Sequence, residues 1–283
     1  MPIDIVIPLG KGSRWKNNEI RFALRSIEKH VKNYRDIYIV GVLPHWMTGV
    51  KHYSHEDKHN HERNIYEKIK FACNLHSLSD NFLFMNDDHF ITKDVDAENY
   101  PYLYSQTLDE KVRGRGGKNN WRGAGDPYTI SIRNTRNALQ GHPQKYFDIH
   151  TPIIYNKAEF IRVMSLVNWN IGMGYVIKSL YANFLNIEGE QGKDIKIANP
   201  NYKEIKRRIE GSNVFSISDS AIGQGLKKVL HELYPTTSKN EAVQLETMTM
   251  TTVIKPTIQQ PTGRTFNGAR DGVYISHQIA TEI

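Results

Sequence analysis

The chain has 283 residues, of which 39% are hydrophobic, and this is enough to bury one substantial core with additions. Its apolar runs fall short of the roughly 18 residues that span a membrane, and its first residues lack a signal-peptide pattern, so we expect a cytoplasmic protein without a transmembrane segment. The single cysteine, Cys73, excludes an intrachain disulfide, and a net charge of +7 favours an anionic partner without choosing one.

The first ninety residues alternate between strand and helix patterns. Residues 3–9 are β-branched and almost wholly apolar, which is typical of a buried parallel strand. Helical spacing of apolar residues follows over residues 20–31 and returns over 65–75, and further strand patterns cover residues 37–42 and 82–85. This order predicts an α/β fold with a mostly parallel sheet flanked by helices, and a ligand site at the carboxyl ends of the strands.

The chain is less regular after these ninety residues. We expect one domain over residues 1–241, with a nucleotide-binding half at 1–100 and an acceptor half at 101–241. Residues 242–283 are rich in Thr, Gln and Gly, and we interpret them as a C-terminal extension.

A basic, glycine-rich stretch covers residues 111–125. Such a stretch predicts a solvated surface loop. The functional alternative is a flap that closes on phosphates, in which Trp121 would stack on a base or a sugar.

The strand pattern at residues 82–85 ends abruptly in Asn86, Asp87, Asp88 and His89. Neighbouring carboxylates repel each other and lose solvation on partial burial, so a cation or a donated proton must compensate them. Hard oxygen ligands suit Mg²⁺ or Mn²⁺. We therefore predict a metal site with Asp88 as the principal ligand and Asp87 assisting. A plain turn is the alternative, because Asn and Asp also favour turns.

Asp148 and His150 are the candidates for general base catalysis. In an extended segment, residues two apart share one face, so the Asp148 carboxylate could orient the His150 imidazole. Such a pair can take a proton from an acceptor hydroxyl. The alternative is a structural histidine.

Contacts to a phosphorylated donor substrate are predicted from two helices and from the end of the strand at residues 82–85. Arg21, Arg25 and Lys68 would contact phosphates if their helices turn them inward, and solvated helix faces are the alternative for each. Asn86 and Asp87 complete the predicted donor-binding set.

Other catalytic motifs receive less support. Residues 55–59 match the His-Glu-x-x-His motif of zinc peptidases, which needs a helix so that both imidazoles face one metal. The flanking residues provide no apolar stripe that would bury such a helix. The sequence has no Gly-x-Ser-x-Gly motif and no complete P-loop, which disfavours serine hydrolases and P-loop enzymes.

Several segments resemble the second conserved region of the Stealth family of sugar-phosphate transferases. They are residues 18–30, 35–40, 44–46, 55–57, 78–82 and 86–88. His150 with Pro152 is similar to the family's third region, and Asp194 to an acid of its fourth. The resemblance implies a GT-A-type, Rossmann-like fold that uses a nucleotide sugar and commonly passes on hexose 1-phosphate, as in capsule synthesis.

Two departures from the family pattern lie on the donor side. The family's first block, an acid-rich strand ending in Trp-Val-Asp-Gly, is reduced here to residues 4–10 without an Asp before the glycine. The Asn-rich segment that precedes the second helix in the family is replaced by residues 58–64.

These observations predict a metal-dependent glycosyltransferase. It would move a sugar, or as the second choice a sugar phosphate, from a nucleotide-sugar donor to a hydroxyl of a glycan or glycolipid, with Mn²⁺ or Mg²⁺ as cofactor. Three alternatives stay open: a phage-type glycosyltransferase that modifies hydroxylated bases in DNA, a hydrolase that delivers water at the same site, and a non-enzymatic basic protein that binds nucleic acid.

Overall fold

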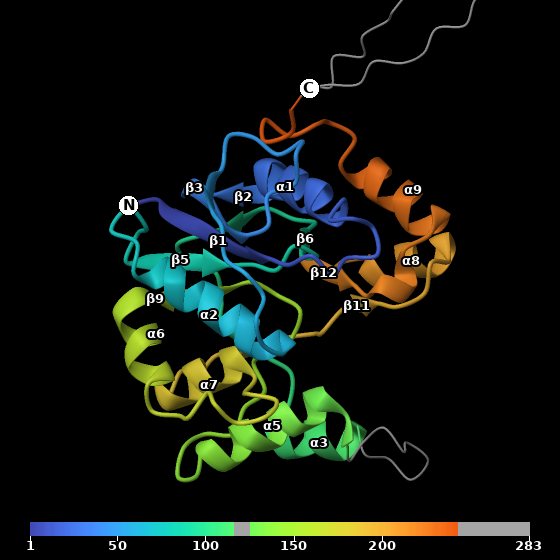
Figure 1. Ribbon diagram of the computed structural model, residues 1–283. Coiled ribbons are helices and arrows are strands. Elements are labelled where there is room, and N and C mark those ends of the chain that lie inside the picture. Colours follow the sequence, from blue (N-terminus) through green and yellow to red (C-terminus); the bar gives the residue numbers. More distant parts are fainter. Residues whose placement is uncertain (116–124, 243–283) are drawn as a thin grey trace, which may run out of the picture. The chain divides into compact units, whose positions relative to one another are not determined.

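A computed structural model describes residues 1–115 and 125–242, all within one compact unit, Met1–Gln244. Its centre is a five-stranded sheet in the order β4-β3-β1-β5-β9 (Figure 1). The strands are β1 (Ile3–Leu9), β3 (Tyr34–Gly41), β4 (Lys51–Tyr53), β5 (Asn81–Phe84) and β9 (Ile153–Asn156). All neighbouring pairs are parallel except β5 and β9. The predicted α/β class with a mostly parallel sheet is confirmed.

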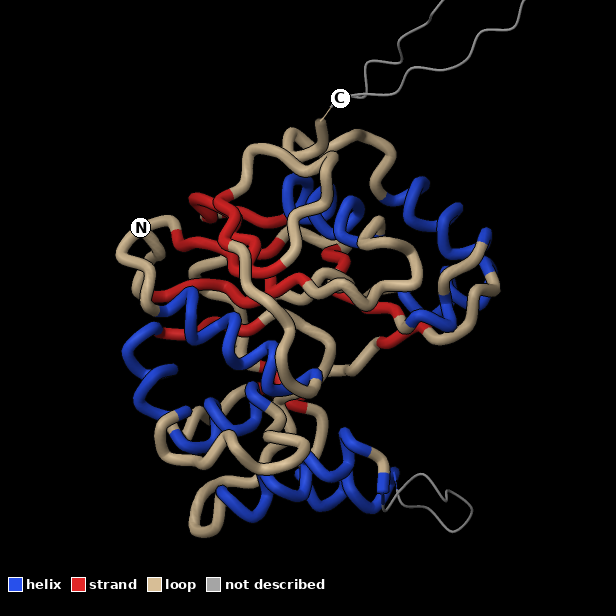
Figure 2. Tube along the Cα trace, viewed as in Figure 1, coloured by secondary structure: helices blue, strands red, loops and turns tan. Residues whose placement is uncertain are grey.

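Eight helices of the described ranges surround this sheet, and Figure 2 shows the strands gathered between two groups of them. They are α1 (Glu19–His30), α2 (His61–Cys73), α3 (Leu108–Arg115), α5 (Pro127–Ala138), α6 (Lys157–Met164), α7 (Ile177–Phe184), α8 (Tyr202–Ile209) and α9 (Gln224–Leu233). The helices α1 and α2 lie where the sequence predicts them.

Short elements complete the described part. A three-stranded sheet joins β11 (Lys196–Ile197), β12 (Val214–Ile217) and β6 (Phe90–Ile91). Two pairs of strands are parallel: β8 (Leu103–Tyr104) with β10 (Glu190–Gln191), and β2 (Val31–Lys32) with β7 (Val95–Asp96). A 3-10 helix, η1, covers Asp219–Ala221.

The predicted loop at residues 111–125 is partly wrong. Residues 111–115 belong to α3, because the turn before this helix is closed by a reciprocal pair of bonds. The Thr107 amide donates to the Glu110 carboxylate at 2.8 Å, and the Glu110 amide donates to the Thr107 hydroxyl at 3.2 Å. Residues 116–124, with Trp121 among them, and the predicted extension beyond residue 242 lie outside the described residues.

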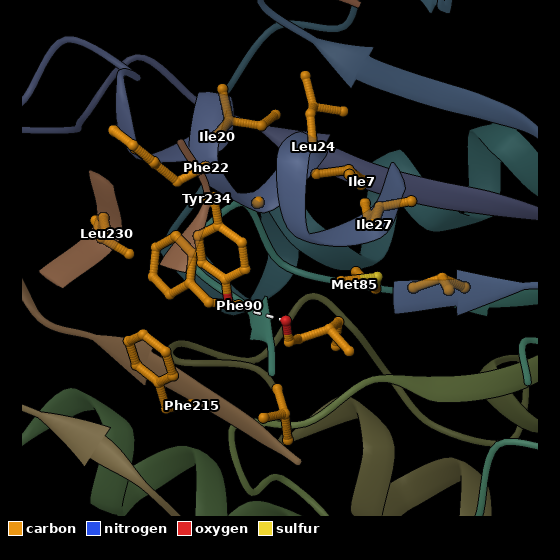
Figure 3. Close-up of a cluster of buried hydrophobic side chains, with 14 of the residues drawn as sticks. Ile7, Ile20, Phe22, Leu24, Ile27, Met85, Phe90, Phe215, Leu230 and Tyr234 are labelled. Atoms are coloured by element: carbon orange, nitrogen blue, oxygen red, sulfur yellow. Dashed lines mark hydrogen bonds between the residues drawn. The ribbon is translucent and has the colours of Figure 1, made fainter. Parts of the chain in front are cut away.

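The central sheet separates two hydrophobic cores, because alternate residues of a strand face opposite sides. Ile7 of β1 belongs to the core that contains α1, α8 and α9, whereas Val6 belongs to the core that contains α2, α6 and α7. Figure 3 shows the first core, where Ile20 and Ile27 of α1 lie in the same cluster as Ile7. Two buried faces explain why β1 is apolar at nearly every position.

A buried carboxylate fixes the amino-terminal end of the sheet. Asp4 is fully buried and accepts hydrogen bonds from the Arg35 guanidinium at 2.9 and 2.5 Å and from the Asp36 amide at 3.2 Å. It also accepts from the Ser79 amide at 2.7 Å, so one side chain joins β1, β3 and the segment before β5. At their other ends, β1 leads into residues 10–13 and β5 into residues 86–88.

Replacing Asp4 with Asn should therefore destabilise the whole domain. An amide cannot accept all of these bonds and leaves the arginine without its charged partner, so we expect the free energy of unfolding in urea to fall by about 3 kcal/mol. The control is Asp36→Asn, which removes a solvent-exposed ion pair with Lys51 (2.8 Å) and should cost less than about 1 kcal/mol. Equal losses in the two variants would contradict this role for Asp4.

Candidate active site

A cavity of about 820 Å³ opens at the carboxyl ends of β1 and β5. This is the position at which open parallel sheets bind ligands, and the volume suits a small-molecule substrate. The wall is highly charged. Its acidic members are Glu19, Asp57, Glu62, Asp87, Asp88, Asp148 and Asp219, and its basic members include Lys68, Lys111, Arg115, Lys178 and Lys196.

Backbone pairing brings the acidic pair to this cavity. Phe84 of β5 lies beside Val6 of β1, and the Met85 amide continues the ladder to the Val6 carbonyl at 3.1 Å. The chain then turns, with the His89 amide donating to the Asn86 carbonyl at 3.2 Å. His89 itself is buried, so the turn presents residues 86–88 to the cavity.

Both carboxyl groups are harder to ionise than usual. Burial, and then repulsion from Asp88 and Glu19, raise the pKa of Asp87 well above its usual range. Burial also raises the pKa of Asp88, although the positive charge of nearby Lys196 opposes the shift. A positive charge bound beside the pair would therefore favour the ionised form of both carboxyl groups.

The residues present fit a divalent cation. Within residues 1–115 and 125–242, no group of three or more acidic, histidine or cysteine side chains is arranged to hold a metal. Mg²⁺ nevertheless binds through one or two carboxylates together with water and substrate phosphates. Asp87 and Asp88, two adjacent carboxylates that face a cavity of substrate size, provide this kind of donor set.

His150 lies in the same cavity, but its partner differs from the predicted one. Its Nδ1 atom lies 2.8 Å from Asp194, and its backbone amide donates to the same carboxylate oxygen at 3.0 Å. Burial disfavours the ionised form of Asp194, but the interactions with His150 outweigh it and lower the pKa of Asp194 to about 2. The prediction that Asp148 orients His150 is wrong, because Nδ1 of His150 is paired with Asp194 and the Asp148 carboxylate is bonded to the start of α7.

Asp148 instead anchors the helix behind the histidine. It accepts from the backbone amides of Lys178 (3.1 Å) and Ser179 (2.8 Å) at the start of α7 and from the Ser179 hydroxyl at 2.5 Å. A carboxylate is stabilised at this position by the free amides and the dipole of the helix. Asp148 lines the cavity, yet its bonds serve the scaffold.

Lys178 ties α7 to the backbone around His150. Its buried ammonium donates to the carbonyl of Ile149 at 2.5 Å and to that of Thr151 at 2.7 Å, which are the two neighbours of the histidine. Burial lowers the pKa of Lys178 to about 8, although nearby acids, Asp148 first, oppose the shift. Lys178 therefore fixes the path of the main chain that carries His150.

Lys68 lines the cavity as predicted for a donor contact, but its ammonium already has protein partners. It lies 2.5 Å from Asp57 and donates to the carbonyl of Leu9, the last residue of β1, at 3.1 Å. Asp57 belongs to the segment that matches the zinc-peptidase motif. That segment, residues 55–59, is not helical, so the geometry the motif requires is absent from it.

Arg21 and Arg25 do not reach the cavity, which corrects their prediction as donor contacts. Both bind Glu241, at 2.9 and 2.6 Å, and the guanidinium of Arg21 also lies 3.7 Å from the centre of the Trp46 ring. These arginines fix the segment around residues 238–242 against α1 and the loop after β3. The structure thus brings together Lys68, Asn86, Asp87, Asp88, Asp148 and His150, and leaves the two arginines elsewhere.

Lys178, Glu62 and Lys196 line the cavity but were not among the predicted site residues. Lys178 stands alone in the apolar run Tyr175–Ala182, and a single charge in such a run is a signal of a buried, functional cation. Glu62 lies among other polar residues and carries no such signal, and Lys196 alternates with Ile195 and Ile197, a pattern that is also typical of the exposed face of a strand.

Comparison with known proteins supports the resemblance. No family model matches the chain. It is 31% identical over 112 residues to human N-acetylglucosamine-1-phosphotransferase subunits alpha/beta, covering 35% of this chain and 9% of the relative. It is 23% identical over 159 residues to capsular polysaccharide phosphotransferase fcs1 of Haemophilus influenzae, covering 50% and 42%. The predicted resemblance to sugar-phosphate transferases is confirmed, and the matches span less than half the length of these curated relatives.

Two glycosyltransferases are among the solved structures that the comparison finds. Galactosyltransferase LgtC gives a TM-score of 0.44 at 12% identity, over 84% of this chain and 98% of that one. GlyE of Streptococcus pneumoniae gives a TM-score of 0.36 at 12% identity, over 83% of this chain and 61% of that one.

In the described residues, no helix has both the length and the apolar character to cross a membrane.

The role of Lys178 can be separated from general stability with a matched lysine. Lys157 also donates to two carbonyls, those of Leu75 and Leu78, both at 3.0 Å, but outside the cavity. We expect Lys178→Met and Lys157→Met each to lower the free energy of unfolding by about 1 to 3 kcal/mol. Only Lys178→Met should lower kcat, by about a hundredfold, because it releases the histidine segment. Equal kcat losses would contradict this assignment.

Glu62 should make the stability of the folded domain depend on pH. Burial, followed by repulsion from Asp148, raises the pKa of Glu62 to about 8, whereas the unfolded chain should show the usual value near 4.5. The folded state therefore holds more protons between pH 4.5 and 8, and its stability falls as pH rises through that range. Glu62→Gln should remove this loss, gaining about 1 kcal/mol or more on the wild type between pH 5 and 8.

Urea unfolding at pH 5, 6.5 and 8 measures this difference. The control is Glu67→Gln, which lies on the same helix outside the cavity and should keep the wild-type slope. A Glu62→Gln curve parallel to that of the wild type would contradict the raised pKa of Glu62.

Proposed function

We propose that this chain is a metal-dependent transferase that moves a sugar phosphate from a nucleotide sugar to a hydroxyl of a glycan. The observation that carries the proposal is that Asp87, Asp88 and His150 line one cavity of substrate size and that His150 is paired with Asp194. The names of the two sequence relatives, both phosphotransferases and one acting in capsular polysaccharide, support phosphate transfer and a glycan acceptor.

The histidine pair supplies the base. Asp194 holds the Nδ1 side of the imidazole, so the Nε2 atom is the one that can take the proton of an acceptor hydroxyl. The hydroxyl oxygen then forms a bond to the phosphorus next to the sugar. The bond from that phosphorus to the bridging oxygen breaks, and the nucleoside monophosphate leaves with that oxygen and its electron pair.

Asp88 and Asp87 would hold the cation, Mg²⁺ or Mn²⁺, which supplies charge neutralisation to the diphosphate when bound. We further propose that Lys68 and Asn86 lie on the donor side, next to the end of β1 and the turn after β5. The division into a donor half over residues 1–100 and an acceptor half over 101–241 remains a prediction, as does the cytoplasmic location. None of the relatives above is named for an action on DNA, and a DNA acceptor is not proposed.

Transfer of the sugar alone is the second candidate. The same base would then direct the hydroxyl to the sugar carbon, and a nucleoside diphosphate would leave. The fold similarity to glycosyltransferases does not decide between the two, because one fold carries many reactions. The released nucleotide distinguishes the two reactions, because phosphosugar transfer releases a monophosphate and sugar transfer a diphosphate.

The test is incubation of the full chain with nucleotide sugars, Mn²⁺ and an oligosaccharide acceptor, with chromatography of the nucleotides. We expect monophosphate release that depends on the acceptor, and a fall of at least about a hundredfold in Asp88→Asn, because the carboxylate that holds the cation is lost. The control is Asp94→Asn, an exposed carboxylate paired with His30 outside the cavity, which should keep full activity.

Diphosphate release would replace phosphosugar transfer with sugar transfer. Unchanged turnover in Asp88→Asn would contradict the metal site, and release of nucleotide without an acceptor would indicate a hydrolase.

A further inference from the structure

Both ring nitrogens of His150 have partners within the protein. The Nδ1 atom faces Asp194 at 2.8 Å, and the Nε2 atom lies 3.0 Å from the ammonium of Lys196. An ammonium group has only donors, so Nε2 must be the acceptor of this bond and carries no proton. The proton is then on Nδ1, where the Asp194 carboxylate accepts it. The two contacts thus agree on a neutral imidazole with its lone pair on Nε2.

This tautomer is the one that a base needs, but its lone pair is occupied. An acceptor hydroxyl cannot give its proton to Nε2 while the Lys196 ammonium donates to the same atom. These two contacts therefore hold the base in the right form and block it at the same time.

The side chain of Lys196 can move away from Nε2 while its backbone stays in place. Its backbone is fixed in β11, where Lys196 lies beside Ser216 of β12 and the Ser216 amide donates to Ile195 at 2.9 Å. Its side chain is long and only partly buried, and across the described ranges it forms no ion pair with a carboxylate. The ammonium is thus held by a neutral nitrogen although it lies in a cavity made for charged ligands.

We propose that Lys196 is a diphosphate-binding residue which covers Nε2 of His150 until the donor arrives, so that donor binding frees the base. The inference rests on the proposed function and adds an order of events to it. The diphosphate would lie by Asp88, whose carboxylate already interacts with the charge of Lys196. Charged acceptors form stronger hydrogen bonds with an ammonium than neutral ones do, so the phosphate oxygens outcompete Nε2. The acceptor hydroxyl then finds a free lone pair.

This arrangement has a consequence for the reaction. The base works only when the donor is bound, so a hydroxyl or a water molecule that enters an empty cavity is not activated. Donor binding before acceptor activation follows from the geometry of one lysine.

Imidazole ¹⁵N NMR tests the inference without turnover. The probe is inorganic pyrophosphate with Mg²⁺, and the His150 signals are assigned by their absence from His150→Asn. In the wild type, the probe should move the Nε2 signal from the position of an ammonium-bonded nitrogen to that of a free one. In Lys196→Met, Nε2 should show the free position from the start and should not move.

Calorimetry adds a second measurement. Lys196→Met should bind Mg²⁺-pyrophosphate at least about tenfold more weakly than the wild type, because it loses one charged hydrogen bond. The matched control is Lys193→Met, an exposed lysine of the same segment, which should bind the probe and shift Nε2 like the wild type.

The outcomes separate the two proposals. If pyrophosphate binds to the wild type but Nε2 does not move, or if Lys196→Met binds it equally well, the role of Lys196 is overturned and the proposed function stands. If the wild type neither binds pyrophosphate nor releases nucleotide from any donor, the proposed function itself fails.

Discussion

Charge compensation within one partly buried cavity is the constraint on which the site depends. Asp87 and Asp88 lie side by side at the end of β5, and burial makes their ionisation costly. The surrounding cations relieve this cost only in part, since Lys68 is bound to Asp57 and Lys178 to two carbonyls. A bound cation with its phosphates would complete the balance.

The scaffold keeps these charges in place from several directions. The buried Asp4 fixes the far ends of the strands, and the pairing of β1 with β5 places the turn that carries the acids. Asp148 and Lys178 link α7 to the segment of His150. Few of these residues need to touch a substrate, yet each decides where a reacting group lies.

Much of the fold could be predicted from sequence, because β1, α1 and β5 have strong local patterns that agree with their tertiary surroundings. The acidic pair could be found for the same reason, since a charged turn after a buried strand is a local feature. The partner of His150 could not: Asp194 lies 44 residues further along the chain. Arg21 and Arg25 were misplaced because their partner, Glu241, comes from the other end of the described chain.

The most direct measurement of the central claim is a crystal structure with Mn²⁺ and a nucleoside diphosphate, in which the metal is located by its anomalous scattering. The account predicts a manganese peak bound by Asp88 and Asp87, with the phosphates between it and His150. A peak elsewhere, or a diphosphate bound outside this cavity, would contradict it.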